Sequence, residues 1–329
     1  MPFGERHIER GAFLDLMATP TVPGTMRAVR LGPPGGVEHI AGEELPTPSP
    51  AAGEALVRVH AAAITRNELD WPVDRLPATP SHELSGVVVG LAPDAVGVSL
   101  GDDVYALTRF DRDGVAADYV AVPASLLAPK PRTLDHVAAA ALPLAGLSAW
   151  QGLFDHGGLE AGQRVLVHGA AGGVGHLAVQ LAHHHGAHVI ATASAANAEW
   201  VRQLGADDVI DDSAMPFDDA VDDLDLVFDT VGGQRLQRSV AVVRLGGRLV
   251  SVAEAPPQAP ATLRGVTAVY FIVEPNQEQL VALAALADAG NVRPEIDEVF
   301  PLADAKAAFE RTMRPGRRGK IVLSVTSDA

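Results

Sequence analysis

Glycines in one stretch of the chain are spaced as they are where proteins bind phosphate. The stretch reads "RVLVHGAAGGVGHLAVQLA": an apolar run typical of a buried strand, then four glycines, then the apolar spacing of a helix. Glycine there permits a tight turn and lets the backbone approach a pyrophosphate, whose charge faces the helix N-terminus. A second apolar run, "HVIATAS", follows about twenty residues later, as in dinucleotide-binding units. The predicted pyrophosphate-binding residues are Gly169, Ala170, Gly172, Gly173, Val174 and Gly175.

The end of the second apolar run indicates which dinucleotide binds. NAD sites usually place Asp or Glu there to hold the ribose hydroxyls. This chain has "TASAAN" instead, and because an acidic side chain would repel the 2′-phosphate of NADP, its absence favours NADPH. Ser194 and Asn197 can donate hydrogen bonds to that phosphate, although no Lys or Arg appears before Arg202. We predict NADPH as the cofactor, with NADH as the alternative.

The composition excludes several other kinds of site. The chain has 329 residues and a formal net charge of −16, which would repel a nucleic-acid backbone. It has no cysteine, so no disulfide, thiolate nucleophile or thiolate metal ligand is available.

No apolar run reaches the roughly 18 residues of a membrane helix. Residues 1–25 lack the features of a signal peptide and are expected to be an extension outside the fold. We therefore expect a cytoplasmic protein with no membrane or nucleic-acid partner.

The elements that must position these residues are of two kinds. Short strands separated by Pro and Gly clusters follow Met26 and predict a barrel-like unit. Farther along, strands alternate with helices, which predicts a parallel, doubly wound sheet and an α/β fold class. Thr133 and Asn276 are predicted as N-caps of two helices. The later stretch "PEIDEVFPLADAKAAFERTM…GKIVLSV" is expected to return to the first unit, because a lone strand-helix-strand has no core of its own.

Together these stretches resemble the medium-chain dehydrogenase/reductase superfamily, specifically its zinc-independent quinone-oxidoreductase (zeta-crystallin-like) branch. The resemblance runs from about Met26 to Val325. It rests on "AAAITRNELDW", "HELSGVVVG", "GDDVYAL", "LPLAGLSAWQGL", "VLVHGAAGGVGHLAVQLA", "LGADDVID", "DTVGG" and "GKIVL". It implies a GroES-like β-barrel catalytic domain, residues 26–145 and 291–329, and a Rossmann cofactor-binding domain inserted between, residues 146–290. It also implies that hydride passes from the nicotinamide to an activated double bond.

The pair His82-Glu83 raises the question of a metal. Zinc-dependent relatives hold the metal with an early Cys, a His-Glu pair and a later ligand. Thr65 stands at the Cys position here, and "PLAGLSAW" offers no Cys, His or carboxylate near the later position. Because a neutral hydroxyl is a far weaker zinc ligand than a thiolate, we predict that no metal binds. The pair is expected to fix the loop that enters the next strand.

The resemblance also implies residues for catalysis. Asn67 and Asp70 match the branch's Asn-x-x-Asp pattern, and the Asn67 amide could hold a substrate carbonyl during hydride transfer. The alternative is that Asn67 only caps a short turn. Trp71 and Tyr105 could line an apolar pocket or belong to the core. The remaining cofactor-binding predictions are Thr230, Val231 and Gly232 near the nicotinamide ribose, Phe271, Ile272 and Val273 beside the nicotinamide, and Lys320 in "GKIVL". Where the family often has a Tyr against the adenosine phosphate, this chain has Asp212.

The leading hypothesis is a zinc-independent, NADPH-dependent reductase of quinones or α,β-unsaturated carbonyls. Residues 269–273 should form an exposed sheet edge through which two copies pair into a homodimer. One alternative is a dedicated enoyl reductase or cyclisation-step enzyme of a biosynthetic pathway. Another is an NADPH-binding protein without turnover. A zinc alcohol dehydrogenase is the third.

Overall fold

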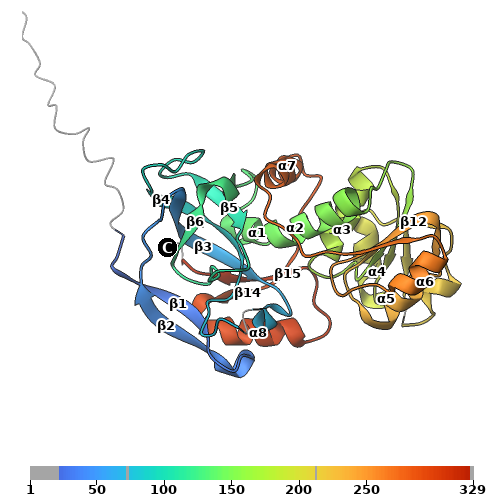
Figure 1. Cartoon of the computed structure of the whole chain (residues 1–329), viewed down its shortest axis with the longest axis horizontal. Helices are drawn as coiled ribbons and strands as arrows, with labels where there is room; N and C mark the ends of the chain where they lie inside the picture. The colour runs from blue at the N-terminus through green and yellow to red at the C-terminus, as the bar shows by residue number, and fades with distance from the viewer. Residues whose placement is uncertain (1–21, 72–73, 212, 327–329) are drawn as a thin grey trace, which may run out of the picture.

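The computed structural model describes residues 22–71, 74–211 and 213–326. Figure 1 shows a strand-rich unit at one end of the molecule and a layered helix-and-sheet unit at the other. The first unit contains the blue strands from the start of the chain and the red strands from near its end. Segments far apart in the sequence therefore build one sheet, as the sequence of the later stretch predicts.

Six parallel strands form the sheet of the layered unit. Their order is β10-β9-β8-β11-β12-β13. This is the strand order of dinucleotide-binding folds, and it reverses between β8 and β11, where such sheets bind ligands outside the carboxyl ends of their strands. The strands are β8 (Arg164–His168), β9 (His188–Thr192), β10 (Asp208–Ile210), β11 (Leu224–Asp229), β12 (Val243–Ser251) and β13 (Thr267–Tyr270). The helices that accompany them are α3 (Gly175–His184), α4 (Ala195–Gln203), α5 (Gly233–Ser239) and α6 (Gln258–Leu263).

The strand-rich unit contains a second sheet, whose order is β14-β15-β3-β4-β5-β7, with β6 paired to β3. β15 lies between β14 and β3, so a strand from residues 320–324 completes a sheet begun near residue 54. A separate hairpin joins β1 to β2. The strands are β1 (Thr25–Leu31), β2 (Ile40–Pro46), β3 (Glu54–Ile64), β4 (Glu83–Leu91), β5 (Asp103–Leu107), β6 (Tyr119–Pro123), β7 (Ala128–Pro129), β14 (Ile296–Pro301) and β15 (Lys320–Ser324).

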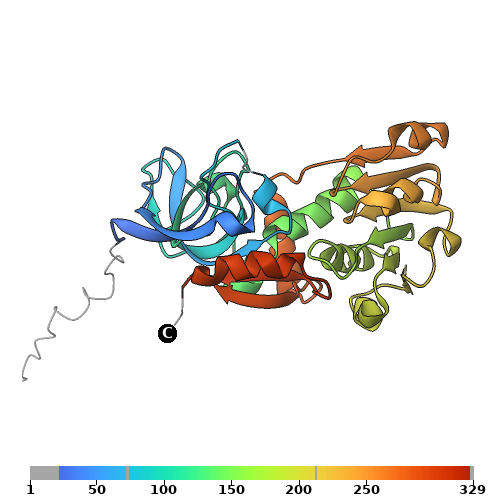
Figure 2. The same cartoon turned by 90° about the horizontal axis from the view of Figure 1, so that it is seen from below.

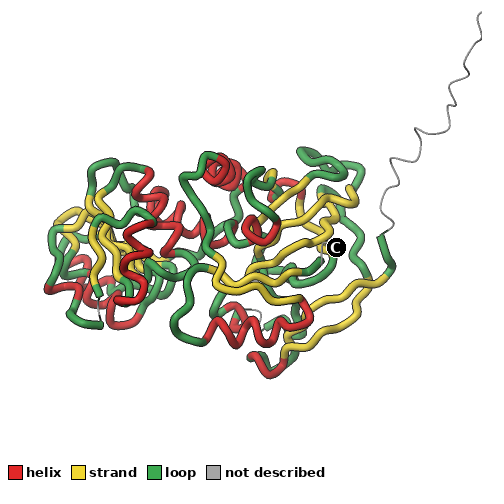
Figure 3. The backbone as a smooth tube through the Cα atoms, turned by 180° about the vertical axis from the view of Figure 1, so that it is seen from behind, coloured by secondary structure: helices red, strands yellow, loops and turns green. Residues whose placement is uncertain are grey.

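Four further helices complete the fold. Two of them lie at the junction between the units and share one apolar core with α3. Leu142, Leu147 and Leu283 are buried in the same cluster as Leu177 of α3. Figures 2 and 3 show these connecting helices between the two groups of strands, and Figure 2 shows α8 beside β1 and β2. The helices are α1 (His136–Ala140), α2 (Pro143–Trp150), α7 (Gln277–Asp288) and α8 (Ala305–Met313).

The predicted α/β class with a parallel sheet is confirmed. The side chain of Asn276 accepts a hydrogen bond from the backbone of Gln279, so this predicted N-cap of α7 is confirmed too. Residues 1–21 of the predicted extension lie outside the described residues, and β1 begins at Thr25. Among the residues described, no helix combines the length and apolar character needed to cross a membrane.

Candidate cofactor and active site

The glycine-rich loop follows β8 and leads into α3, at the point where the strand order reverses. Gly169 has φ +72°, and a Cβ there would lie 2.7 Å from the hydroxyl oxygen of Thr230. A Cβ at Gly175 would lie 2.2 Å from the carbonyl oxygen of Gly169. Both positions exclude a side chain, because real Cβ atoms do not approach other atoms this closely. The loop is therefore held tightly against the end of β11.

The middle of the loop forms a cradle that side chains would fill. A Cβ at Gly172 would lie 3.2 Å from the Gly169 carbonyl oxygen, and one at Gly173 would lie 3.0 Å from Cδ of Lys320. The cradle stands at the N-terminus of α3, which favours negative charge. These residues fit the pyrophosphate of a dinucleotide. Ala170 is fully buried, and Val174 is partly buried against the core.

The loop after β11 is held by a buried carboxylate. Asp229 accepts hydrogen bonds from the backbone of Gly232 at 3.0 Å and from the Ser251 hydroxyl at 2.8 Å, and burial raises its pKa above the ordinary value. The Thr230 hydroxyl donates to the carbonyl of His168 at 2.7 Å, which joins this loop to the end of β8. The predicted ribose-binding residues Thr230 to Gly232 thus lie beside Gly169, and Val231 is exposed.

The segment after β13 alternates between core and surface. Phe271 and Val273 are buried in the core, whereas Ile272 is 65% exposed. The Phe271 ring lies 4.4 Å from the ring of His156. A ligand at this segment would therefore meet the backbone of Phe271 and Val273, and only Ile272 offers an exposed side chain.

A buried charge cluster includes Glu83 and Thr65, which the resemblance places at metal-ligand positions of zinc-dependent relatives. The Lys320 ammonium is paired with the carboxylate of Glu83, and it donates to the Thr65 hydroxyl at 3.1 Å. Lys320 is 4% exposed and Glu83 is 0% exposed. The second oxygen of Glu83 accepts from the backbone of Leu144, in the first turn of α2, at 2.9 Å. Glu83 thus joins the barrel to α2 and to β15.

Zinc does not fit this set of donors. Over the residues that the structure describes, no group of three or more His, Cys, Asp or Glu side chains is placed to hold a metal ion. The carboxylate of Glu83 already faces a cation, and a divalent ion beside the Lys320 ammonium would be repelled. His82 is buried 3.4 Å from the Thr108 hydroxyl, and burial lowers its pKa to about 4.

The loop that presents His82 and Glu83 is strained and braced. Ser81 has φ +68°, an uncommon conformation for a residue other than glycine. Its backbone N–H is bonded to the carboxylate of Glu68, which also accepts from the backbone of Thr65 at 2.8 Å. Burial raises the pKa of Glu68 to about 8, against the effect of these two hydrogen bonds and of nearby Lys320. Glu68 therefore ties the loop to the turn that contains Asn67.

Asn67 lies at the start of a short 3-10 helix, η3 (Glu68–Asp70). It is exposed, and its side chain makes no capping hydrogen bond, so the capping alternative does not describe this structure. Trp71 is 36% exposed and packs edge-on against Phe110 at 5.2 Å between ring centroids. The ring of His82 lies 6.1 Å from that of Trp71. Trp71 is thus the outer member of an aromatic cluster beside the buried charges.

Tyr105 does not line an open pocket, contrary to the pocket role given to it from the sequence. Its side chain is fully buried in the core between the two units, and its hydroxyl donates to the carbonyl of Leu280 in α7 at 2.5 Å. Burial of an aromatic ring whose hydroxyl has a buried acceptor makes it a core residue.

The residues predicted to bind the 2′-phosphate of NADPH lie at the start of α4. Ser194 is exposed, and its side chain makes no capping hydrogen bond to α4. Asn197 is buried, and its side-chain oxygen accepts from the Nε–H of Arg318 at 2.6 Å. Arg318 was missed by the sequence analysis, although the basic stretch "RPGRRGK" around it was a visible signal. Asp212 lies outside the described residues.

A buried histidine joins the glycine-rich loop to the strand-rich unit. Nδ1 of His176 lies 2.9 Å from the carbonyl of Gly172, and Nε2 accepts from the backbone of Glu295 at 3.0 Å. This pattern requires a neutral ring with its proton on Nδ1. Burial lowers the pKa of His176 to about 4.

This neutral histidine predicts a loss of stability in acid. Because its pKa is about 4 in the folded chain and 6.5 in the unfolded one, the unfolded state binds more protons as the pH falls through this window. His82 acts in the same direction. Replacing His176 with Gln should therefore reduce the fall in unfolding free energy between pH 6.5 and 4 by about 1.4 kcal/mol per pH unit. Denaturant titrations across this range measure the slope, and exposed His184→Gln is the control. Equal slopes for His176→Gln and wild type would contradict the assignment.

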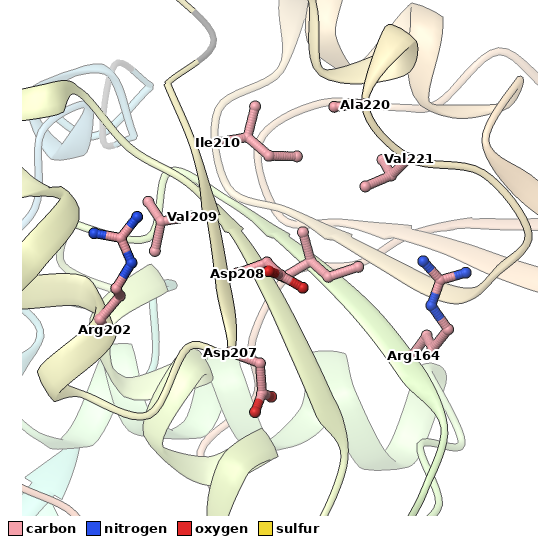
Figure 4. Close-up of a pocket in the computed structure, with 9 residues that line it drawn as sticks. Arg164, Arg202, Asp207, Asp208, Val209, Ile210, Ala220 and Val221 are labelled. Atoms are coloured by element: carbon pink, nitrogen blue, oxygen red, sulfur yellow. The ribbon is translucent and has the colours of Figure 1, made fainter.

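Two hollows flank the parallel sheet. One, of about 340 Å³, is lined by Arg164, Arg202, Asp207 and Asp208, among others (Figure 4). This hollow runs along β10, from Asp208 at its start to Ile210 at its end, and the glycine-rich loop does not line it. The other, of about 390 Å³, borders Gly232 and Gly233, which follow the carboxyl end of β11.

Comparisons with known proteins agree with this arrangement. Residues 51–132 match the family model described as alcohol dehydrogenase GroES-like domain, and residues 204–323 match the model described as zinc-binding dehydrogenase. A probable zinc-binding oxidoreductase, mitochondrial, of Arthroderma benhamiae is 34% identical over 326 residues, covering 93% of this chain and 98% of that protein. The NADPH-dependent alkenal/one oxidoreductase, chloroplastic, of Arabidopsis thaliana is 33% identical over 95% of this chain and 83% of its own length. The structure of the quinone oxidoreductase from Coxiella burnetii superposes with a TM-score of 0.87 at 31% identity, covering 92% of this chain and 100% of that one.

Proposed function

The chain belongs to the quinone-oxidoreductase branch of the medium-chain dehydrogenase/reductase superfamily, and we propose on that basis that it is a zinc-independent, NADPH-dependent reductase of quinones or α,β-unsaturated carbonyls. The observation that carries the zinc-independent part is the cluster of Lys320, Glu83 and Thr65. The Lys320 ammonium is paired with Glu83 and bonded to Thr65, the two positions at which the resemblance implies metal ligands in zinc-dependent relatives, and this pairing supports a reaction without zinc.

The residues present can hold the cofactor and orient a substrate. Gly172, Gly173 and Gly175 would hold the pyrophosphate, and the loop from Thr230 to Gly232 would lie along the nicotinamide ribose. When bound, NADPH supplies a hydride. The amide of Asn67 would donate a hydrogen bond to the substrate oxygen, where negative charge develops as the hydride arrives. Trp71, with Phe110 behind it, offers an apolar surface to a ring or alkyl group.

The proposal includes a homodimer. β13 stands at the end of the parallel sheet and pairs there with β12. Tyr270 and Ile272, at and just after its end, are exposed apolar side chains. Pairing of two such edges would extend the sheet and cover both side chains. A cytoplasmic location stays a prediction, because the names of relatives include mitochondrial and chloroplastic proteins.

The proposed reaction can be tested by following nicotinamide absorbance with chelator-treated protein. NADPH and NADH would each be offered with ortho- and para-quinones and with simple enones. We expect oxidation of NADPH faster than of NADH, at a rate that neither chelation nor added zinc changes. Loss of activity on chelation, restored by zinc, would contradict the metal-free reaction. Oxidation with one elaborate acceptor alone would favour the dedicated biosynthetic enzyme, and no oxidation at all would favour a binding protein.

A further inference from the structure

One arginine of the strand-rich unit lies against the parallel-sheet unit. Arg318 precedes β15, yet its Nε donates to the side-chain oxygen of Asn197 at 2.6 Å, and its Nη2 donates to the carbonyl of Ala196 at 2.9 Å. Its guanidinium carbon lies 5.3 Å from the centre of the Trp200 ring. Three neighbouring residues of α4 thus fix a half-buried guanidinium over the first turns of that helix.

This position matters because α4 directly follows β9. β9 is the second strand of the dinucleotide-binding unit, and its carboxyl end faces the adenosine ribose in such folds. No acidic residue stands at this end in "TASAAN", and Ser194 is exposed there. A guanidinium is permanently charged and has five N–H donors in a plane, which suits bidentate binding of phosphate. The two contacts to α4 use Nε and Nη2, which leaves further donors for an anion.

The charges around Arg318 leave its guanidinium available. The nearby carboxylate of Asp297 accepts from the backbone N–H of Arg318 at 3.0 Å and is paired with Arg311 at 2.8 Å. Arg311 also faces Glu298 at 3.4 Å, so it offsets part of the negative charge of these two carboxylates. Asp211 also lies at the α4 N-terminus, beside the backbone of Ala195. Hydrogen bonds from Ser213, and then from the backbone of Ala195, hold its pKa below the ordinary value. A phosphate bound at this end of α4 would be repelled by Asp211 and attracted by Arg318.

We propose that Arg318 is the residue that distinguishes NADPH from NADH, by pairing with the 2′-phosphate of the adenosine ribose. This inference rests on the proposed function and adds the source of its cofactor preference. The positive charge that sequence analysis did not find near Ser194 and Asn197 comes from the strand-rich unit. The 2′-phosphate is then held from both units at once, by α4 and by the segment that leads into β15.

Binding measurements on the purified full chain test the proposal without catalysis. Calorimetry would give dissociation constants for NADPH, NADH, adenosine 2′,5′-bisphosphate and 5′-AMP. In Arg318→Gln we expect binding of the two 2′-phosphorylated ligands to weaken about tenfold or more, the effect of losing one charge-assisted pair. NADH and 5′-AMP should change less than about twofold. Arg318→Lys should fall between, because it keeps the charge and loses the planar donors. Asp211→Asn should strengthen NADPH binding, because it removes a negative charge that would repel the 2′-phosphate.

Arg314→Gln is the matched control. Arg314 belongs to the same basic stretch, but its partner is Glu310 at the surface, 4.0 Å away. The variant Arg314→Gln removes one positive charge, as Arg318→Gln does, but it removes no contact with α4. NADPH binding should therefore stay within about twofold of wild type. Equal weakening of NADPH and NADH in Arg318→Gln would overturn the inference and make Arg318 a link between the units. Unchanged NADPH binding would overturn it as well. Wild-type protein that binds neither dinucleotide would overturn the proposed function itself, which is a distinguishable result.

Discussion

Replacing Lys320 with methionine is expected to lower the free energy of unfolding by about 3–5 kcal/mol. Methionine fills similar volume but leaves the fully buried carboxylate of Glu83 without its cation, and an uncompensated buried charge costs this much. The Thr65 hydroxyl loses its donor as well. Urea titrations at neutral pH, read by circular dichroism, would measure the change.

The double variant decides whether the pair is the cause. Glu83→Gln alone should also destabilise the fold, because it leaves the Lys320 ammonium buried and unpaired. Removing both charges in Lys320→Met with Glu83→Gln should recover much of the loss, since a buried pair replaced as a unit is often nearly neutral. If the two losses simply add, Lys320 and Glu83 do not stabilise each other, and the argument against a metal loses its physical basis.

Replacing Asn67 with alanine is expected to reduce kcat by about 10²–10³ with little effect on stability. Loss of one preorganised donor to a developing oxyanion has an effect of this size. The side chain is exposed and makes no capping bond, so the free energy of unfolding should change by less than about 0.5 kcal/mol. Initial rates with a quinone or enone acceptor, at saturating NADPH, would measure kcat and KM separately.

The exposed residue Asn291, which follows α7, provides the control, and Asn291→Ala should leave kcat unchanged. Asn67→Asp is informative too, because a carboxylate keeps the size of the side chain but cannot donate while ionised. It should lose activity as alanine does. A kcat of Asn67→Ala equal to that of wild type would remove Asn67 from the reaction.

Features that depend on neighbouring residues could be predicted from the sequence. The glycine-rich loop follows its strand directly, and the Asn276 cap bonds a backbone group three residues away. The α/β class could be predicted for the same reason, because apolar strands and helices alternate along the chain. These signals are local, so one stretch of sequence contains both partners.

Long-range contacts could not be predicted. Lys320 meets Glu83 across 237 positions, and Arg318 meets Asn197 across 121. Thr133 was expected to cap a helix, but it bonds Asp288 at the end of α7, and Asp135 caps α1 instead. Tyr105 lies in the core, where its hydroxyl donates a hydrogen bond to a carbonyl 175 positions away. In each case a partner from another element decided the role of the side chain.

The place of β15 in its sheet has a consequence for synthesis on the ribosome. The six strands of the parallel sheet emerge in one continuous stretch of the chain, so that unit can fold early. The last four residues of β3, Ala61 to Ile64, pair with β15, and Thr65 meets Lys320, 255 positions later. Until then this end of β3 has one unpaired edge and Glu83 has no cation. A nascent chain should therefore gain its active site late, after the parallel-sheet unit has folded, and we expect chaperones to engage the strand-rich unit in the interval.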